Sequence, residues 1–156
     1  MVYDFCYALH IPVTIYGHDT SCRNVNLYSF TKFDSVDDNY KYCLMNIQDG
    51  GSNCDGCAVR FVVEKLCKRN EDCKLFIVIA DGQPADGGYY GTADELDLQG
   101  IRKEYANKGI TFLAAAIGDD KPAIKCCYGE GSFLDITDLK VFPMTIAKII
   151  GRYALG

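Results

Sequence analysis

Acidic side chains follow three apolar runs of this sequence, at the points where buried strands are expected to end. The segments that come after the runs are 17–20 (Gly-His-Asp-Thr), 81–86 (Asp-Gly-Gln-Pro-Ala-Asp) and 118–120 (Gly-Asp-Asp). An open α/β sheet binds ligands outside the carboxyl ends of its strands. Glycines and short acids are also ordinary loop residues, so one such segment alone does not indicate a site. Three of them at one edge favour a site for a cation or a polar ligand.

Cys54 and Cys57 have the Cys-x-x-Cys spacing of half a structural zinc site or of a redox dithiol. A structural zinc site needs four ligands, and the sequence holds no second pair with this spacing. A redox dithiol lies at the start of a helix, where the thiolate is stabilised, and a helix is expected to start here. We nevertheless expect most of the nine cysteines to be reduced thiols that pack as small hydrophobic residues.

His10 and His18 are the only histidines of the chain. Neither is accompanied by a Gly-x-Ser-x-Gly nucleophile motif, and no glycine-rich phosphate-binding motif is present. His10 comes at a predicted helix end, where a cation is favoured. His18 is expected in a surface loop after a strand, with lining of the acidic edge as the alternative.

The elements that must position these side chains alternate between strands and helices. Strands are predicted over 11–16, 24–30, 75–80, 110–117 and 132–136, and helices over 2–9, 56–68, 93–108 and 143–153. The runs 75–80 and 110–117 are apolar throughout, as in a parallel sheet that is covered on both faces. The alternation predicts an α/β, Rossmann-like fold: a mostly parallel sheet with helices on both faces. The 156 residues suit one domain over 1–156.

The composition, 49% hydrophobic and 24% charged, is that of an ordinary soluble globular protein. A formal charge of −5 and scattered Lys and Arg residues argue against a nucleic-acid partner, because phosphate contacts need clustered basic side chains. No apolar stretch approaches the roughly 20 residues that span a bilayer. The residues after Met1 do not form a signal peptide, so we expect a cytoplasmic protein.

Three stretches resemble the von Willebrand factor A (vWA) family. Residues 77–84 (Ile-Val-Ile-Ala-Asp-Gly-Gln-Pro) resemble its fourth-strand signature, residues 50–59 its second metal-site motif, and residues 108–119 its next strand. The pairing of Asn53-x-Asp55-Gly56 with Asp81-Gly-x-Pro84 is most similar to the branch that contains the cobaltochelatase large subunit and related activator proteins. The resemblance covers roughly residues 2–153.

The resemblance implies a metal-ion-dependent adhesion site, in which three loops hold one Mg²⁺ or similar divalent ion. The family's loops supply Asp-x-Ser-x-Ser, a Thr and an Asp, and Asp81 matches the last of these. The second loop is matched by Ser52 if the paired glycines anchor the alignment, or by Asn53 if Ala58 does. Asp55 is then a nearby acid that binds the ion directly or through water. Mg²⁺ prefers an octahedron of oxygens and keeps several waters, which leaves a position for an acidic side chain of a partner protein.

The family's first strand and its Asp-x-Ser-x-Ser motif have no counterpart in these residues. In the family's strand order, 3-2-1-4-5-6, this strand would be central, between 11–16 and 75–80. Buried backbone groups left unpaired cost about 1–3 kcal/mol each. We expect a domain truncated at its N-terminus, with the strand upstream in a longer product. The alternatives are a strand donated by a partner or a second copy and direct pairing of the flanking strands. Without the first motif, Mg²⁺ binding should be weak.

The leading hypothesis is therefore a non-catalytic protein–protein interaction module with a partial adhesion site. Its predicted metal-site residues are Asp81, Ser52, Asn53 and Asp55. The cobaltochelatase-type resemblance implies an AAA ATPase as partner, in a chelatase-like or remodelling complex. A metal-dependent hydrolase or phosphoryl-transfer enzyme that uses Asp81, with His18 as its only candidate base, is an alternative of another class. A thiol-redox protein that uses Cys54 and Cys57 is the third.

Overall fold

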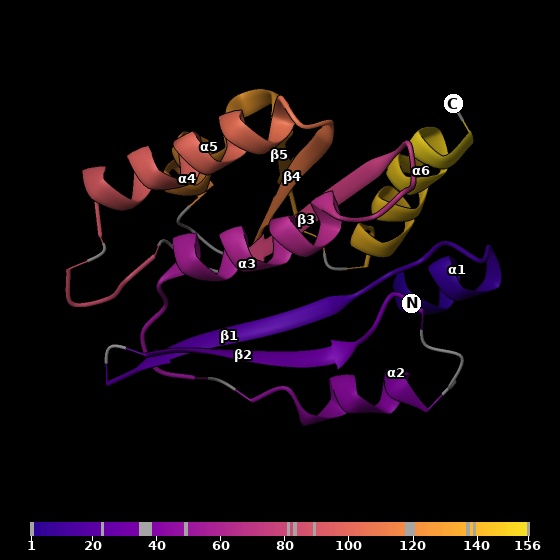
Figure 1. Cartoon of the computed structure of the whole chain (residues 1–156), viewed down its shortest axis with the longest axis horizontal. Helices are drawn as coiled ribbons and strands as arrows, with labels where there is room; N and C mark the ends of the chain where they lie inside the picture. Colours follow the sequence, from indigo (N-terminus) through magenta and orange to yellow (C-terminus); the bar gives the residue numbers. More distant parts are fainter. Residues whose placement is uncertain are drawn as a thin grey trace. The chain divides into compact units, whose positions relative to one another are not determined.

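The chain consists of two compact units, residues 1–53 and residues 54–156. A computed structural model describes residues 2–22, 24–34, 39–48, 50–80, 82, 84–88, 90–117, 121–136, 138 and 140–155. Each unit has its own sheet (Figure 1). None of the described helices is long and apolar enough to cross a membrane.

The first unit is built on an antiparallel hairpin. Its elements are α1 (Val2–Ala8), β1 (Ile15–Ser21), β2 (Asn24–Thr31), the short helix α2 (Tyr40–Cys43) and the 3₁₀ turn η1 (Leu44–Asn46). β1 and β2 pair in register from Ile15 opposite Thr31 to Ser21 opposite Asn24, with an irregularity next to Ile15. The alternation of residues 24–30 correctly predicts β2, since one face of an antiparallel pair can be polar.

The prediction of a strand over 11–16 followed by a loop over 17–20 is wrong. β1 begins at Ile15 and continues through the whole of 17–20. Pro12 has no backbone N–H and is unsuited to a ladder, whereas the polar stretch after Tyr16 pairs with the polar residues of β2. The carboxyl-end loop expected at His18 and Asp19 is thus the middle of a hairpin strand.

The second unit contains a three-stranded parallel sheet in the order β3-β4-β5. Its elements are α3 (Asp55–Cys67), β3 (Lys74–Ala80), α4 (Thr92–Ala106), β4 (Ile110–Ala116), α5 (Lys121–Tyr128), η2 (Glu130–Ser132), β5 (Phe133–Asp135) and α6 (Phe142–Leu155). β3 and β4 pair along their full length, whereas β5 pairs only with Ala114–Ala116. Figure 1 shows α3, α4 and α5 close together and α6, in yellow, apart from them.

The core of the second unit lies between the sheet and the helices α3, α4 and α5. α4 packs between α3 and α5, and its Leu98 and Ile101 are almost completely buried. The other fully buried members include Val63 of α3, Ile124 of α5, and Ala114 and Ala116 of β4. Burial of these side chains from three helices and one strand supplies the main stabilising term of the unit.

The described strands form two sheets rather than one. The coarse prediction is confirmed: the fold is mixed α/β, with a parallel sheet flanked by helices that is compatible with a Rossmann-like arrangement. Direct pairing of the two strands that flank the missing one, which would give a five-stranded sheet, is not found in the described part of the chain.

Candidate functional site

The residues of the predicted metal site belong to different parts of the structure. Ser52 and Asn53 end the first unit, where the backbone N–H of Thr20 donates to the carbonyl oxygen of Ser52 at 2.6 Å. Asp55 is the first residue of α3 in the second unit. Asp81 lies outside the described residues. Among the residues that are described, no group of three or more His, Cys, Asp and Glu side chains is arranged to hold a metal ion.

The topology of the second unit brings two helix starts to the carboxyl edge of its sheet. α3 leads into the beginning of β3, so its first residue, Asp55, lies at the opposite end, near the edge where β3 stops. α4 follows β3 in the chain, so its first turn, with Asp94, starts from the same edge. This is the edge at which open α/β sheets bind ligands.

Asp55 and Asp94 are both buried at this edge. Their exposed fractions are 5% and 2%, which is exceptional for carboxylates. The backbone N–H of Glu95 donates to Oδ1 of Asp94 at 2.9 Å. Burial raises the pKa of Asp94, and the negative charges of Glu95 and Asp55 raise it further. A carboxylate that is removed from water and lies in electrostatic range of a second one favours the binding of a proton or a cation.

Sequence reasoning missed Asp94. An acid in the first turn of a helix is a common feature, because it offsets the positive end of the helix dipole, and the sequence around Asp94 does not differ from that pattern. Only the burial of α4 against α3 and α5 separates it from Glu95, which is partly exposed. The residue before α4 is Gly91, which has a φ of +62° and no side chain to cap the helix. Asp94 and Glu95 are the acidic residues of the first turn.

The thiols in electrostatic range of Asp94 have raised pKa values. Burial raises the pKa of Cys127 to about 12, and the charges of Asp94 and Glu95 add to the rise. The pKa of Cys126 is raised first by a hydrogen bond with Glu95 and then by burial. Because a thiolate is the form that binds metals and attacks electrophiles, the raised pKa values of both thiols disfavour a metal-binding or nucleophilic role for them.

In the first unit, Asp19 forms a polar cluster across the hairpin. Its carboxylate accepts hydrogen bonds from Nδ2 of Asn26 at 2.6 Å and from the Tyr28 hydroxyl at 2.8 Å, which lower its pKa. Gly50 lies so close that a Cβ there would clash with the side chain of Asp19. The segment that leads to Ser52 therefore packs along β1. Asp19 stabilises the hairpin through its hydrogen bonds to two residues of β2.

Cys54 directly precedes α3, as expected for a dithiol at a helix start. Cys54 is half-buried and Cys57 is exposed. Burial raises the pKa of the Cys54 thiol to about 11, and the Cys57 thiol and the charge of Asp86 contribute to the rise. Redox enzymes lower the pKa of the attacking cysteine instead, so Cys54 is a weak nucleophile at neutral pH.

Comparisons with protein-family models and with curated proteins find no match for this chain. The hydrolase alternative relies on His18, which lies inside β1 of the first unit and not in a loop. Asp55 and Asp94 are the two carboxylates that the described structure buries and brings into electrostatic range of one another.

Proposed function

We propose that this chain is a vWA-like protein-interaction module, not an enzyme, with a divalent-cation site at the carboxyl edge of its parallel sheet. The observation that carries the proposal is the pair of buried carboxylates, Asp55 and Asp94, at the starts of α3 and α4. A divalent cation such as Mg²⁺ takes carboxylate oxygens as ligands and removes the repulsion between two buried negative charges. Asp81, which the resemblance assigns to the same site, comes directly after β3 in the sequence.

The proposed role of the ion is to capture an acidic side chain of a partner protein. Mg²⁺ retains several of its waters when a protein holds it by one or two carboxylates, and a partner's Asp or Glu can replace one of them. The resemblance to the cobaltochelatase branch suggests an AAA ATPase as this partner, in a chelatase-like or remodelling complex. Ser52 and Asn53 remain predictions from the resemblance.

The proposal is tested by calorimetric titration of the chain with Mg²⁺ and Mn²⁺. We expect a dissociation constant below about 1 mM, no binding to Asp81→Ala, and at least tenfold weaker binding to Asp94→Asn. Asp97→Asn is the matched control, because Asp97 lies on the same helix but is half-exposed and pairs with Arg60. Its affinity should equal that of the wild type. A wild-type chain that binds neither ion would refute the cation site.

The enzymatic alternatives have less support from the residues that are described. The raised pKa of Cys54 disfavours a thiol-redox catalyst, since the thiolate is the attacking species. Hydrolysis needs a base positioned next to a metal-bound water, and His18, the only candidate base, lies inside the hairpin strand β1 of the first unit. A phosphate-ester turnover screen on wild type and Asp81→Ala separates the two classes, because activity lost with the carboxylate would favour an enzyme.

A further inference from the structure

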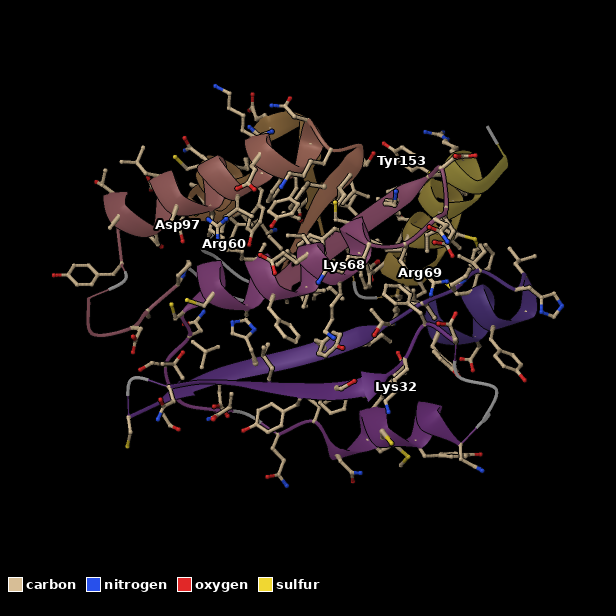
Figure 2. All side chains as sticks on the ribbon, viewed as in Figure 1. Lys32, Arg60, Lys68, Arg69, Asp97 and Tyr153 are labelled. Carbon is tan, nitrogen blue, oxygen red and sulfur yellow. The ribbon has the colours of Figure 1, made fainter. Side chains whose placement is uncertain are left out.

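The second unit contains a cavity at the other end of its sheet, beside the first residues of β4. Its volume is about 380 Å³. The polar side chains that line it are those of Arg102, Thr111, Ser132 and Tyr153. Figure 2 labels Tyr153 on α6. Arg102 is the only charged residue among the described residues of the lining, so the cavity has a positive character in a chain whose formal charge is −5.

The guanidinium of Arg102 has no protein partner within the described residues. Its Nε is buried and makes no hydrogen bond, and no hydrogen bond or ion pair links Arg102 to another described residue. Arg60 differs, because it pairs with Asp97 and Glu104, at 3.5 and 3.1 Å. Figure 2 shows Arg60 on α3 beside Asp97 on α4. A buried charged donor without an acceptor is costly, so Arg102 needs an anion or bound water.

The backbone holds Arg102 in position. A Cβ on Gly129 would lie 2.9 Å from Nη1 and 3.1 Å from Cζ of Arg102, so the guanidinium rests against the bare Cα of this glycine. Gly129 has a φ of +82°, a conformation that side chains disfavour. The position of the guanidinium is therefore determined by packing and not by a salt bridge.

The outer edge of β4 adds a peptide group to the cavity. β5 pairs only with Ala114–Ala116, so the earlier residues of β4, which pair with β3 on one side, have no described strand on the other side and line the cavity there. The N–H of Ile136 donates to the carbonyl of Ala116 on the β5 side. Since peptide groups alternate along a strand, Phe112 also directs its N–H and C=O to that side.

We propose that this cavity binds the oxyanion of a small phosphorylated or carboxylated molecule, with Arg102 as its anchor. The planar guanidinium matches the geometry of phosphate and carboxylate oxygens. The hydroxyls of Thr111 and Ser132 and the peptide N–H of Phe112 offer further donors. Ile110 and Leu113 form apolar walls for the rest of the ligand. The site lies at the amino-terminal end of β4, opposite the edge of Asp55 and Asp94, so it is separate from the proposed cation site.

The test follows the Nε–Hε resonance of Arg102 by NMR in the full chain, with inorganic phosphate and acetate as separate probes and with EDTA present. We expect a saturable shift with phosphate in the low millimolar range, together with shifts of the Phe112 and Ser132 amides. Arg102→Gln should weaken the amide response at least tenfold, while Arg102→Lys, which keeps the charge, should retain part of it. A larger response to acetate than to phosphate would assign the site to carboxylates.

Arg60→Gln is the matched control. It also removes one guanidinium, but the guanidinium of Arg60 is already paired with Asp97 and Glu104. Its phosphate response should equal that of the wild type. Gly129→Ala tests the same site without a change of charge, since it displaces the guanidinium. Gly100→Ala is its control, because a Cβ there meets nothing within 4 Å and Gly100 does not line the cavity. A wild-type chain with no saturable shift up to about 20 mM phosphate, or an unchanged response in Arg102→Gln, would overturn the proposal.

Discussion

At the scale of single residues, the cation proposal depends on the burial of two carboxylates, those of Asp55 and Asp94. Asp55 and Asp94 are separated by 39 positions in the sequence, and only the packing of α3 against α4 brings them into electrostatic range. A carboxylate that is buried near a second one is destabilising while it is ionised. Proteins that retain such pairs generally do so where a cation or a proton is bound.

Asp94→Asn is expected to stabilise the chain at neutral pH in the absence of divalent ions. The folded pKa of Asp94 is raised above its ordinary value. A group of this kind contributes stability that is fully present below its unfolded pKa, near 3.9, and that is lost as the pH rises through the folded pKa. The melting temperature of the variant should exceed that of the wild type at pH 7, by about 2–4 °C for each kcal/mol gained.

Thermal melts of both proteins at pH 4 and pH 7, in EDTA, measure this difference. The difference should shrink toward pH 4, because the raised pKa of Asp94 favours its neutral form as the pH falls. Saturating Mg²⁺ should reverse the order at pH 7, because only the wild type gains stability from the ion. A variant that is less stable than the wild type at pH 7 in EDTA would mean that the carboxylate of Asp94 makes a structural contact which the amide cannot replace.

Residue types alone identify part of this site. Asp55 stands out in the sequence because it precedes a predicted helix, and it does begin α3. His18 and Asp19 are expected in a loop because Gly17 resembles the end of a strand. In fact β1 accommodates Gly17, where a Cβ would lie 2.9 Å from the ring of Phe30. That glycine provides space for a cross-strand aromatic ring and not a turn, a distinction that depends on the strand partner.

At the scale of elements, long apolar patterns are reliable and short polar ones are not. The unbroken runs of β3 and β4 and the stripes of α3, α4 and α6 predict these elements to within two residues at each end. α5 is missed because Lys121–Tyr128 is short and carries only one strongly apolar aliphatic residue, Ile124. Its burial comes from α4 and β4, a tertiary contact that overrides weak local propensity.

Leu98→Ala should destabilise the second unit by about 2–5 kcal/mol, because it removes a fully buried side chain and leaves a cavity. Leu98 is 1% exposed and lies in the core on α4. Leu96→Ala on the same helix is the matched control, since Leu96 is 63% exposed and its loss should change stability by less than about 0.5 kcal/mol. Chemical denaturation followed by circular dichroism measures both. Equal effects of the two substitutions would contradict the packing of α4 between α3 and α5.

At the scale of the whole molecule, the described strands form two sheets that we expect to differ in stability. β4 is paired on both sides and its residues Ala114, Ala115 and Ala116 are fully buried. The hairpin of β1 and β2 has only two strands, and an isolated hairpin of this kind is marginally stable. The chain divides into two units between Asn53 and Cys54, so the two sheets are expected to open separately.

Native-state hydrogen exchange tests this difference in stability. After correction for intrinsic rates, the amides of β4 should exchange at least about tenfold more slowly than the paired amides of β1 and β2, because core strands open only in global unfolding. The amides of Val63 and Ile101 in α3 and α4 should follow β4, since both side chains are fully buried in the same core. Equal protection in the two sheets would mean that the chain opens as one cooperative unit. In that case the hairpin draws stability from the rest of the chain, and a substitution such as Leu98→Ala should accelerate exchange in β1 as much as in β4.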